Sequence, residues 1–132
     1  MTIGAETVRI LFALRDIAPF SRLADAELLL IAGHARLRSF PAGRLVLAKG
    51  TVADHLLAVT AGGARLDGAP VPPVFDAPGL LFGLAASGDH VAGPEGLEAV
   101  VIAKPHVFTI ARECPEFVVG LADLKRWEAP AV

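Results

Sequence analysis

The sequence predicts a mainly β fold with flanking helices, of α+β class: a β-roll or jelly roll preceded by N-terminal helices and followed by one C-terminal helix. Apolar residues recur at helical spacing near both ends of the chain, whereas the middle consists of short apolar or alternating runs separated by glycine, proline and aspartate. A chain of 132 residues can bury one core. We therefore expect a single domain over residues 1–132.

Residues 6–33 are expected to form two helices. In the first, apolar residues recur on one face and the pattern stops at a turn that contains Pro19. The second is predicted over residues 25–33, because acidic residues open the run and Gly33 ends it. The apolar face predicted for the first helix consists of Val8, Leu11 and Phe12.

The predicted β-roll occupies residues 34–112. Its apolar runs are short and evenly spaced, which is typical of all-β proteins. Closing such a sheet into a roll or barrel removes exposed strand edges. The expected strands are 36–40, 45–47, 55–60, 64–66, 74–75, 80–82, 100–102 and 107–110.

One helix is predicted over residues 115–127, because the apolar period becomes helical again and Pro115 suits a first helical turn. Its two faces differ in polarity. The apolar face consists of Phe117, Leu121 and Leu124, and the charged face of Glu116, Asp123, Lys125 and Arg126.

Composition argues against several classes of function. A net charge of −2 gives no basic surface of the kind that nucleic acids require, and the chain lacks Asn and Gln, the usual readers of adenine. No apolar run is long enough to span a bilayer and the first 20 residues do not resemble a secretory signal. We expect a cytoplasmic protein with no nucleic-acid partner and no membrane span.

Cysteine and histidine usage predicts no metal site and no cofactor. Cys114 is the single cysteine, so it can form neither an internal disulfide nor a Cys-based zinc site, and we expect it to be buried as a small apolar residue. The histidines are scattered singly along the chain. They are His34, His55, His90 and His106.

The order of the elements resembles that of the cyclic nucleotide-binding domain family, the sensor fold of catabolite-activator regulators and protein kinase A regulatory subunits. Three stretches carry the resemblance. They are RSFPAGRLVLAKG (38–50), VADHLLAVTAGGARL (52–66), which contains the matching Asp54 and Gly62, and PGLLFG (78–83), similar to the entry of the family's phosphate-binding cassette. The resemblance implies a regulatory module, but we expect no effector domain, such as a DNA-binding helix-turn-helix, in this polypeptide.

The resemblance also implies which residues would bind a cyclic nucleotide. In the family, a glutamate after the Phe-Gly pair binds the ribose, a later arginine neutralises the phosphate, and a short helix between them directs N–H groups at the anion. Here Leu84 replaces the glutamate, and no lysine or arginine occurs between Leu66 and Ala103. The cassette equivalents are Phe82, Gly83, Leu84, Ala85, Ala86, Ser87 and His90.

The missing cation disfavours cyclic AMP or cyclic GMP bound in the usual way. The segment carries five acids, which repel phosphate: Asp67, Asp76, Asp89, Glu95 and Glu98. His90 could supply a positive charge, although we expect an exposed loop histidine. A flexible, shortened loop is predicted around Gly88, Gly93, Pro94 and Gly96.

These observations lead to a functional prediction of a degenerate, stand-alone and non-catalytic module that acts through a protein partner or self-association. The hydrophobic set reaches 54% of the residues, and such a surplus favours a contact patch. The alternative is a sensor that binds a cyclic nucleotide or another small molecule in the β-roll. No catalytic residue is predicted. Candidates for the contact patch are Leu80, Leu81, Phe82 and Leu84, most of which we expect to be core.

Overall fold

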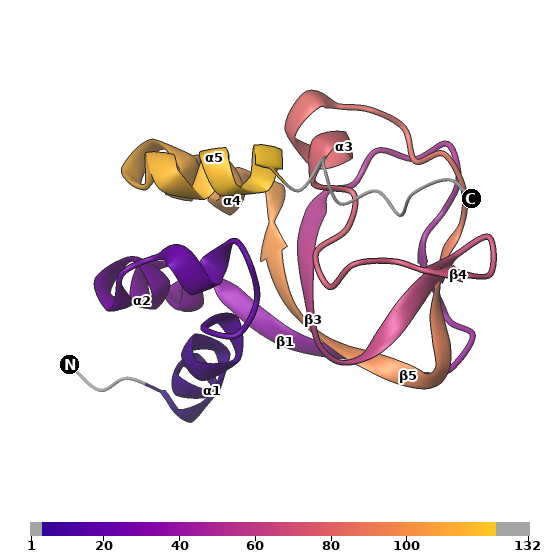
Figure 1. Ribbon diagram of the computed structural model, residues 1–132, viewed down its shortest axis with the longest axis horizontal. Helices are drawn as coiled ribbons and strands as arrows, with labels where there is room; N and C mark the ends of the chain where they lie inside the picture. Colours follow the sequence, from indigo (N-terminus) through magenta and orange to yellow (C-terminus); the bar gives the residue numbers. More distant parts are fainter. Residues whose placement is uncertain (1–3, 124–132) are drawn as a thin grey trace.

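The computed structural model describes residues 4–123 and has the predicted class, an antiparallel sheet with flanking helices (Figure 1). In chain order the elements are α1 (Ala5–Leu14), the 3₁₀ helix η1 (Phe20–Arg22), α2 (Asp25–Gly33), β1 (Ala35–Phe40), β2 (Leu45–Leu47), β3 (His55–Leu66), β4 (Ala69–Pro70), α3 (Ala77–Phe82), β5 (His90–Ala103), α4 (Lys104–Glu113) and α5 (Pro115–Asp123).

The two N-terminal helices are confirmed. Helix α2 has the predicted bounds, and Glu27 in its first turn accepts a hydrogen bond of 3.0 Å from the Ala24 N–H. The apolar face predicted for α1 is only partly right, because Leu11 packs against the core but Val8 is exposed. Ile10 and Leu14 are the buried residues of α1, whereas Phe12 is 55% exposed and lies under the Arg15 guanidinium.

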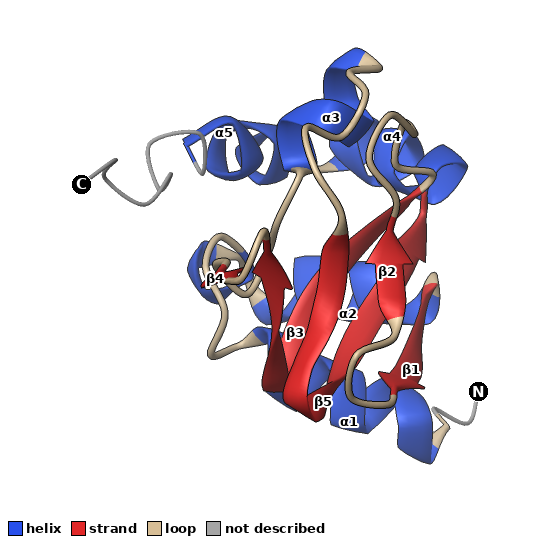
Figure 2. Cartoon of the chain, turned by 90° about the vertical axis from the view of Figure 1, so that its right-hand side faces the viewer, coloured by secondary structure: helices blue, strands red, loops and turns tan. Residues whose placement is uncertain are grey.

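Strands β3 and β5 form the long antiparallel ribbon at the centre of the sheet, whose order is β1-β5-β3-β4, with β2 also paired to β5. In Figure 1 this ribbon curves to the right, away from α1, α2, α4 and α5. Figure 2 shows the strands with α3, α4 and α5 above them.

The two faces of this ribbon are buried in two separate apolar clusters, as strand alternation requires. Leu56 and Val100 belong to a cluster that the helices cover, whereas Val59 and Ala99 belong to a cluster inside the roll. We call the cluster inside the roll the inner cluster, and its members are Phe40, Val59, Ala64, Phe75, Ala92, Leu97 and Ala99.

Three predicted strands are wrong. Residues 80–82 and 107–110 lie in the helices α3 and α4, because short apolar runs fit a buried helix turn as well as a strand, and a proline opens each helix. Of the predicted strand 74–75, only Val74 forms a bridge, to Ala58. The β-roll was predicted to extend over residues 34–112, but strand pairing ends at Ala103.

The C-terminal helix is confirmed as far as the structure describes it. Phe117 and Leu121 are fully buried, and Cys114 before the helix is buried as predicted. Burial and the neighbouring Glu27 carboxylate raise the pKa of the Cys114 thiol. Leu124, Lys125, Arg126 and Trp127 of the predicted helix lie outside the described residues. Within residues 4–123 no helix is long and apolar enough to cross a membrane.

Candidate functional site

The segment equivalent to the phosphate-binding cassette follows α3 and leads into β5. Gly83 ends α3 with a φ of 68°, a left-handed conformation that glycine adopts at low cost. Residues 84–89 then form no helix, and Ala85 makes an isolated bridge to Val52. The short helix that the resemblance implies is therefore absent between Gly83 and His90, and with it the N-terminal N–H groups that would face an anion.

Main-chain hydrogen bonds join this segment to the turn between β2 and β3. The Ala86 N–H donates to the Thr51 carbonyl at 2.8 Å, and the Gly50 N–H donates to the Ala86 carbonyl at 2.9 Å. The N–H groups of Gly83 and Leu84 both donate to the Gly79 carbonyl. Three amides of the short stretch 83–87 thus have partners within the protein.

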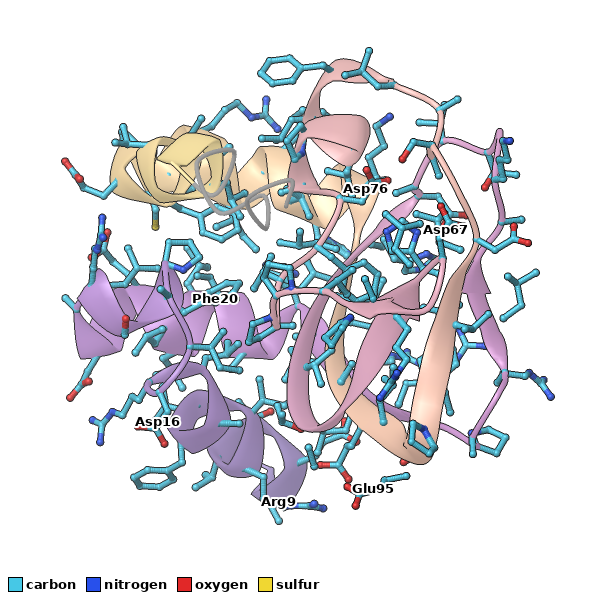
Figure 3. All side chains as sticks on the ribbon, turned by 45° about the vertical axis from the view of Figure 1, so that its right-hand side comes forward. Arg9, Asp16, Phe20, Asp67, Asp76 and Glu95 are labelled. Carbon is cyan, nitrogen blue, oxygen red and sulfur yellow. The ribbon has the colours of Figure 1, made fainter. Side chains whose placement is uncertain are left out.

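Carboxylates flank the same segment. The Lys49 N–H donates to Asp89 Oδ1 at 2.7 Å, and the Asp67 carboxylate packs so closely on Gly88 that a Cβ there would lie 3.0 Å from Asp67 Oδ2. Figure 3 labels Asp67 on the roll side of the molecule. Two of the five acidic residues of the predicted segment thus lie next to residues 84–90.

His90 is a buried residue at the start of β5 and not an exposed loop histidine. It is 4% exposed, pairs with Leu66 and Leu47, and stacks on the Phe75 ring with centroids 5.1 Å apart. Its Nδ1 has no hydrogen-bond partner among residues 4–123. The predicted flexible loop is also wrong, because Gly93, Pro94 and Gly96 belong to the same continuous strand.

The predicted contact patch divides into core and surface. Leu80 is fully buried and Leu81 is partly buried against the same cluster, whereas Phe82 and Leu84 are 65% and 54% exposed. Val52, bridged to Ala85 beside Leu84, is also exposed. We call Val52, Phe82 and Leu84 the apolar ridge.

A cavity of about 80 Å³ lies beside the inner cluster. Its polar lining residues come from β1, the start of β3 and the segment before α3, and no residue of 82–90 contributes. Its apolar lining includes Phe40 and Phe75. The polar lining residues are Arg38, Asp54, His55 and Asp76.

Three of the polar side chains that line this cavity form contacts with neighbouring residues. His55 Nδ1 and Asp54 Oδ1 are 2.7 Å apart, and this hydrogen bond lowers the pKa of the Asp54 carboxyl. The Arg38 guanidinium lies 4.8 Å from the centroid of the Phe40 ring. Within residues 4–123 no group of three or more metal-ligating side chains could hold a metal ion.

Asp76 is the most unusual of these residues. Its φ is 56°, and its Oδ2 is buried without a hydrogen-bond partner among residues 4–123. Burial raises the pKa of the Asp76 carboxyl, and the nearby His90 opposes part of the rise. Figure 3 shows Asp76 on the roll side, below α3.

Sequence reasoning did not identify the cavity, although two signals were available. Arg38 and Phe40 are two residues apart on a predicted strand, which places them on the same face. An aspartate at 76, before the helix-opening Pro78, is a typical start signal for a helix. Neither signal places the residues in one cavity, because β1 and the segment before α3 meet only in the folded chain.

Several solved structures are similar to this chain. The catabolite activator protein of Thermus thermophilus is 24% identical with a TM-score of 0.70, over 86% of this chain and 56% of that protein. A Geobacter metallireducens protein described as a candidate cyclic nucleotide-binding protein is 20% identical with a TM-score of 0.70, over 92% of both chains. The chain thus spans little more than half of the first protein but most of the second.

A third similar structure is the regulatory subunit of a cAMP-independent protein kinase A from Trypanosoma brucei. It is 19% identical with a TM-score of 0.70, over 83% of this chain and 43% of that subunit. A triple mutant of it, in which one threonine becomes arginine, is bound to cAMP in the A site and matches at 18% identity with a TM-score of 0.69, over the same shares of the two chains. No family model matches the sequence. No curated protein matches it either.

Proposed function

We propose that this chain, which has the fold of cyclic nucleotide-binding domains, is a non-catalytic regulatory module that does not bind cAMP or cGMP in the usual way and acts by binding a protein partner. The observation that carries the proposal is the state of the cassette segment. Leu84 stands at the ribose-binding position, no lysine or arginine occurs in residues 67–103, and the amides of Gly83, Leu84 and Ala86 are already bonded.

The energetic cost of these changes is large. Losing a charge-assisted contact to a sheltered anion costs about 2–5 kcal/mol, and every ~1.4 kcal/mol is tenfold in affinity. An unpaired ribose hydroxyl costs about 1–3 kcal/mol more. The described cavity of about 80 Å³ is also smaller than the ~300–1,000 Å³ of typical small-molecule sites. A nucleotide seated in the usual way is therefore strongly disfavoured.

The kinase subunit from Trypanosoma brucei supports the reasoning about charge. That protein has the same fold and is cAMP-independent, and the mutant of it that is bound to cAMP has gained an arginine. An arginine and phosphate form a strong, charge-assisted pair. We infer that this chain lacks cyclic nucleotide binding for the same physical reason.

The apolar ridge is the proposed contact surface, and its surroundings define the partner. Two exposed acidic residues, Asp54 and Asp89, lie within a few residues of the ridge in the sequence. Burying Phe82 and Leu84 removes exposed apolar area from water, at about 25 cal/mol per Å². A complementary partner is a protein segment that presents apolar side chains next to lysine or arginine.

A thermal-shift measurement with cAMP and cGMP tests the first half of the proposal. A ligand at about 100 times its dissociation constant adds ~2.7 kcal/mol, which is worth very roughly 8–15 °C at this size. We expect no shift with either nucleotide. A rise of that size with cAMP or cGMP would mean that the module is a nucleotide sensor.

Paired capture experiments test the second half. The double variant Phe82→Ser/Leu84→Ser removes the apolar ridge, and Phe108→Ser is the matched control because Phe108 is an exposed phenylalanine on α4. We expect one protein to bind the wild type and the control but not the double variant, and its purified form to bind directly. Partners that bind all three proteins equally would exclude the ridge.

A sensor for a small ligand remains the second candidate function, because one specific observation favours it. The cavity beside the inner cluster brings a guanidinium, an imidazole and two carboxylates together in the roll. Its volume excludes a nucleotide but accommodates a molecule of a few heavy atoms.

A further inference from the structure

The cavity beside the inner cluster holds polar groups whose bonding capacity is not used within residues 4–123. Asp76 Oδ2 is buried and lacks a donor. Arg38 is an exposed residue at the mouth of the cavity, and its guanidinium lies over the Phe40 ring. A buried acceptor without a partner is uncommon and calls for an explanation.

The charges in the cavity favour one class of ligand. A simple anion would meet the carboxylates of Asp54 and Asp76, and a simple cation would meet the Arg38 guanidinium. A molecule with both charges can place its carboxylate on Arg38 and its ammonium on Asp76. Such a molecule satisfies the unpaired Asp76 Oδ2 with a donor and the guanidinium with an acceptor.

The size and the apolar lining of the cavity restrict the class of ligand further. About 80 Å³ leaves room for only a few heavy atoms, and aromatic rings of Phe40 and Phe75 contribute to the walls. A side chain no larger than a methyl group fits beside them. We propose that this cavity binds a small zwitterion, an α-amino acid of the size of glycine or alanine, between Arg38 and Asp76.

The backbone at Asp76 is consistent with a binding role. A φ of 56° is sparsely populated by residues other than glycine, and such conformations cluster at ligand sites. None of the cavity residues belongs to the apolar ridge, so this proposal does not depend on the proposed protein partner. Either one can fail while the other stands.

Amide chemical-shift titrations of the full chain test the ligand class. The probes are glycine and L-alanine, and acetate and methylammonium each carry one of the two charges. We expect saturable shifts at Arg38, His55 and Asp76 with a millimolar dissociation constant, because few atoms contribute binding energy. Acetate and methylammonium should bind at least tenfold more weakly.

Matched variants test the binding groups. Asp76→Asn and Arg38→Gln should each weaken the zwitterion at least tenfold. Asp67→Asn and Arg36→Gln are the controls, because Asp67 shares the positive φ and Arg36 lies on the same strand, yet neither lines the cavity. An unchanged amide spectrum away from each substitution shows that a variant is folded.

Three outcomes would overturn the proposal. No saturable shift with any probe would mean that the cavity holds water only. Equal binding of acetate and glycine would mean a plain anion site. Unchanged binding by both Asp76→Asn and Arg38→Gln would mean that the ligand lies elsewhere.

Discussion

His90, which is buried, and Asp76, whose Oδ2 is buried, determine much of the polar character of the roll interior. The His90 ring stacks on Phe75 and occupies space beside the inner cluster, and its Nδ1 is unpaired within residues 4–123. The position of the ring indicates a packing role for His90. It does not support the alternative role of His90 as a ligand of phosphate. The Asp76 carboxylate lies against Gly79 of α3, where a Cβ would be 2.5 Å from Asp76 Oδ2, and its burial disfavours the charged form.

Two substitutions of His90 separate the contribution of ring packing to stability from that of the imidazole nitrogens. His90→Phe keeps an aromatic ring against Phe75 and removes the unpaired nitrogen, so the free energy of unfolding should stay within about 1 kcal/mol of wild type or rise. His90→Ala leaves a cavity and should lose about 3 kcal/mol. Urea denaturation followed by circular dichroism measures both. A large loss with His90→Phe would show that the imidazole itself is needed.

Asp76 predicts a pH dependence of stability. The folded-state pKa of this carboxyl is above its usual value of 3.8, so its stabilising contribution is complete below pH 3.8 and is lost as the pH rises through the folded pKa. Asp76→Asn cannot ionise. The difference in unfolding free energy, variant minus wild type, should therefore increase from pH 4 to pH 7. A difference that stays constant over this range would contradict the raised pKa.

The β3–β5 ribbon depends on close backbone contact between the strands. Gly62 has a φ of 71°, and a Cβ at this position would collide with the Gly96 carbonyl of β5. The pairing between the two strands is irregular on both sides of Gly62. Gly62, one of the residues that carry the family resemblance, lies inside β3 at an irregularity that helps the ribbon to bend.

Two adjacent glycines provide a direct comparison. Gly62→Ala should lower the free energy of unfolding by about 2–5 kcal/mol, through the left-handed backbone and the collision. Gly63→Ala should be neutral or stabilising by up to about 1 kcal/mol, because no atom lies within 4 Å of a Cβ there. Thermal unfolding of both variants measures the difference. Equal effects would mean that the ribbon can separate at this point.

The molecule as a whole is held together by contact between its two ends. Phe20 from η1 and Phe117 from α5 are both fully buried, with ring centroids 5.5 Å apart. The cluster that contains them also includes Leu56 and Val100 of the central ribbon. The N-terminal helices, the roll and the C-terminal helices therefore share one apolar core.

Removing Phe20 tests this cooperativity. Phe20→Ala should cost about 3–5 kcal/mol and shift the helical and sheet signals of circular dichroism together in urea. Phe12→Ala is the control, because Phe12 is 55% exposed and its loss should cost less than about 1 kcal/mol. Two separate transitions in the Phe20 variant would indicate that the roll folds independently.

Local patterns in the sequence determined the fold class, the bounds of α2 and the absence of a cation from residues 67–103. These features depend on residue type and on spacing within a few residues, so no tertiary information is required. The sequence also shows that residue 84 is apolar, at the position where the resemblance implies a ribose-binding glutamate.

Only the tertiary structure decided how the interior of the roll is filled. It buried His90 on Phe75, bonded Ala86 to Thr51, and brought Arg38 and Asp76 to one cavity. Each of these contacts joins segments that are far apart in the chain. Strand pairing and the bend of the β3–β5 ribbon determine which of those segments meet. Neither feature can be recognised from the local spacing of residue types in the segments that come into contact.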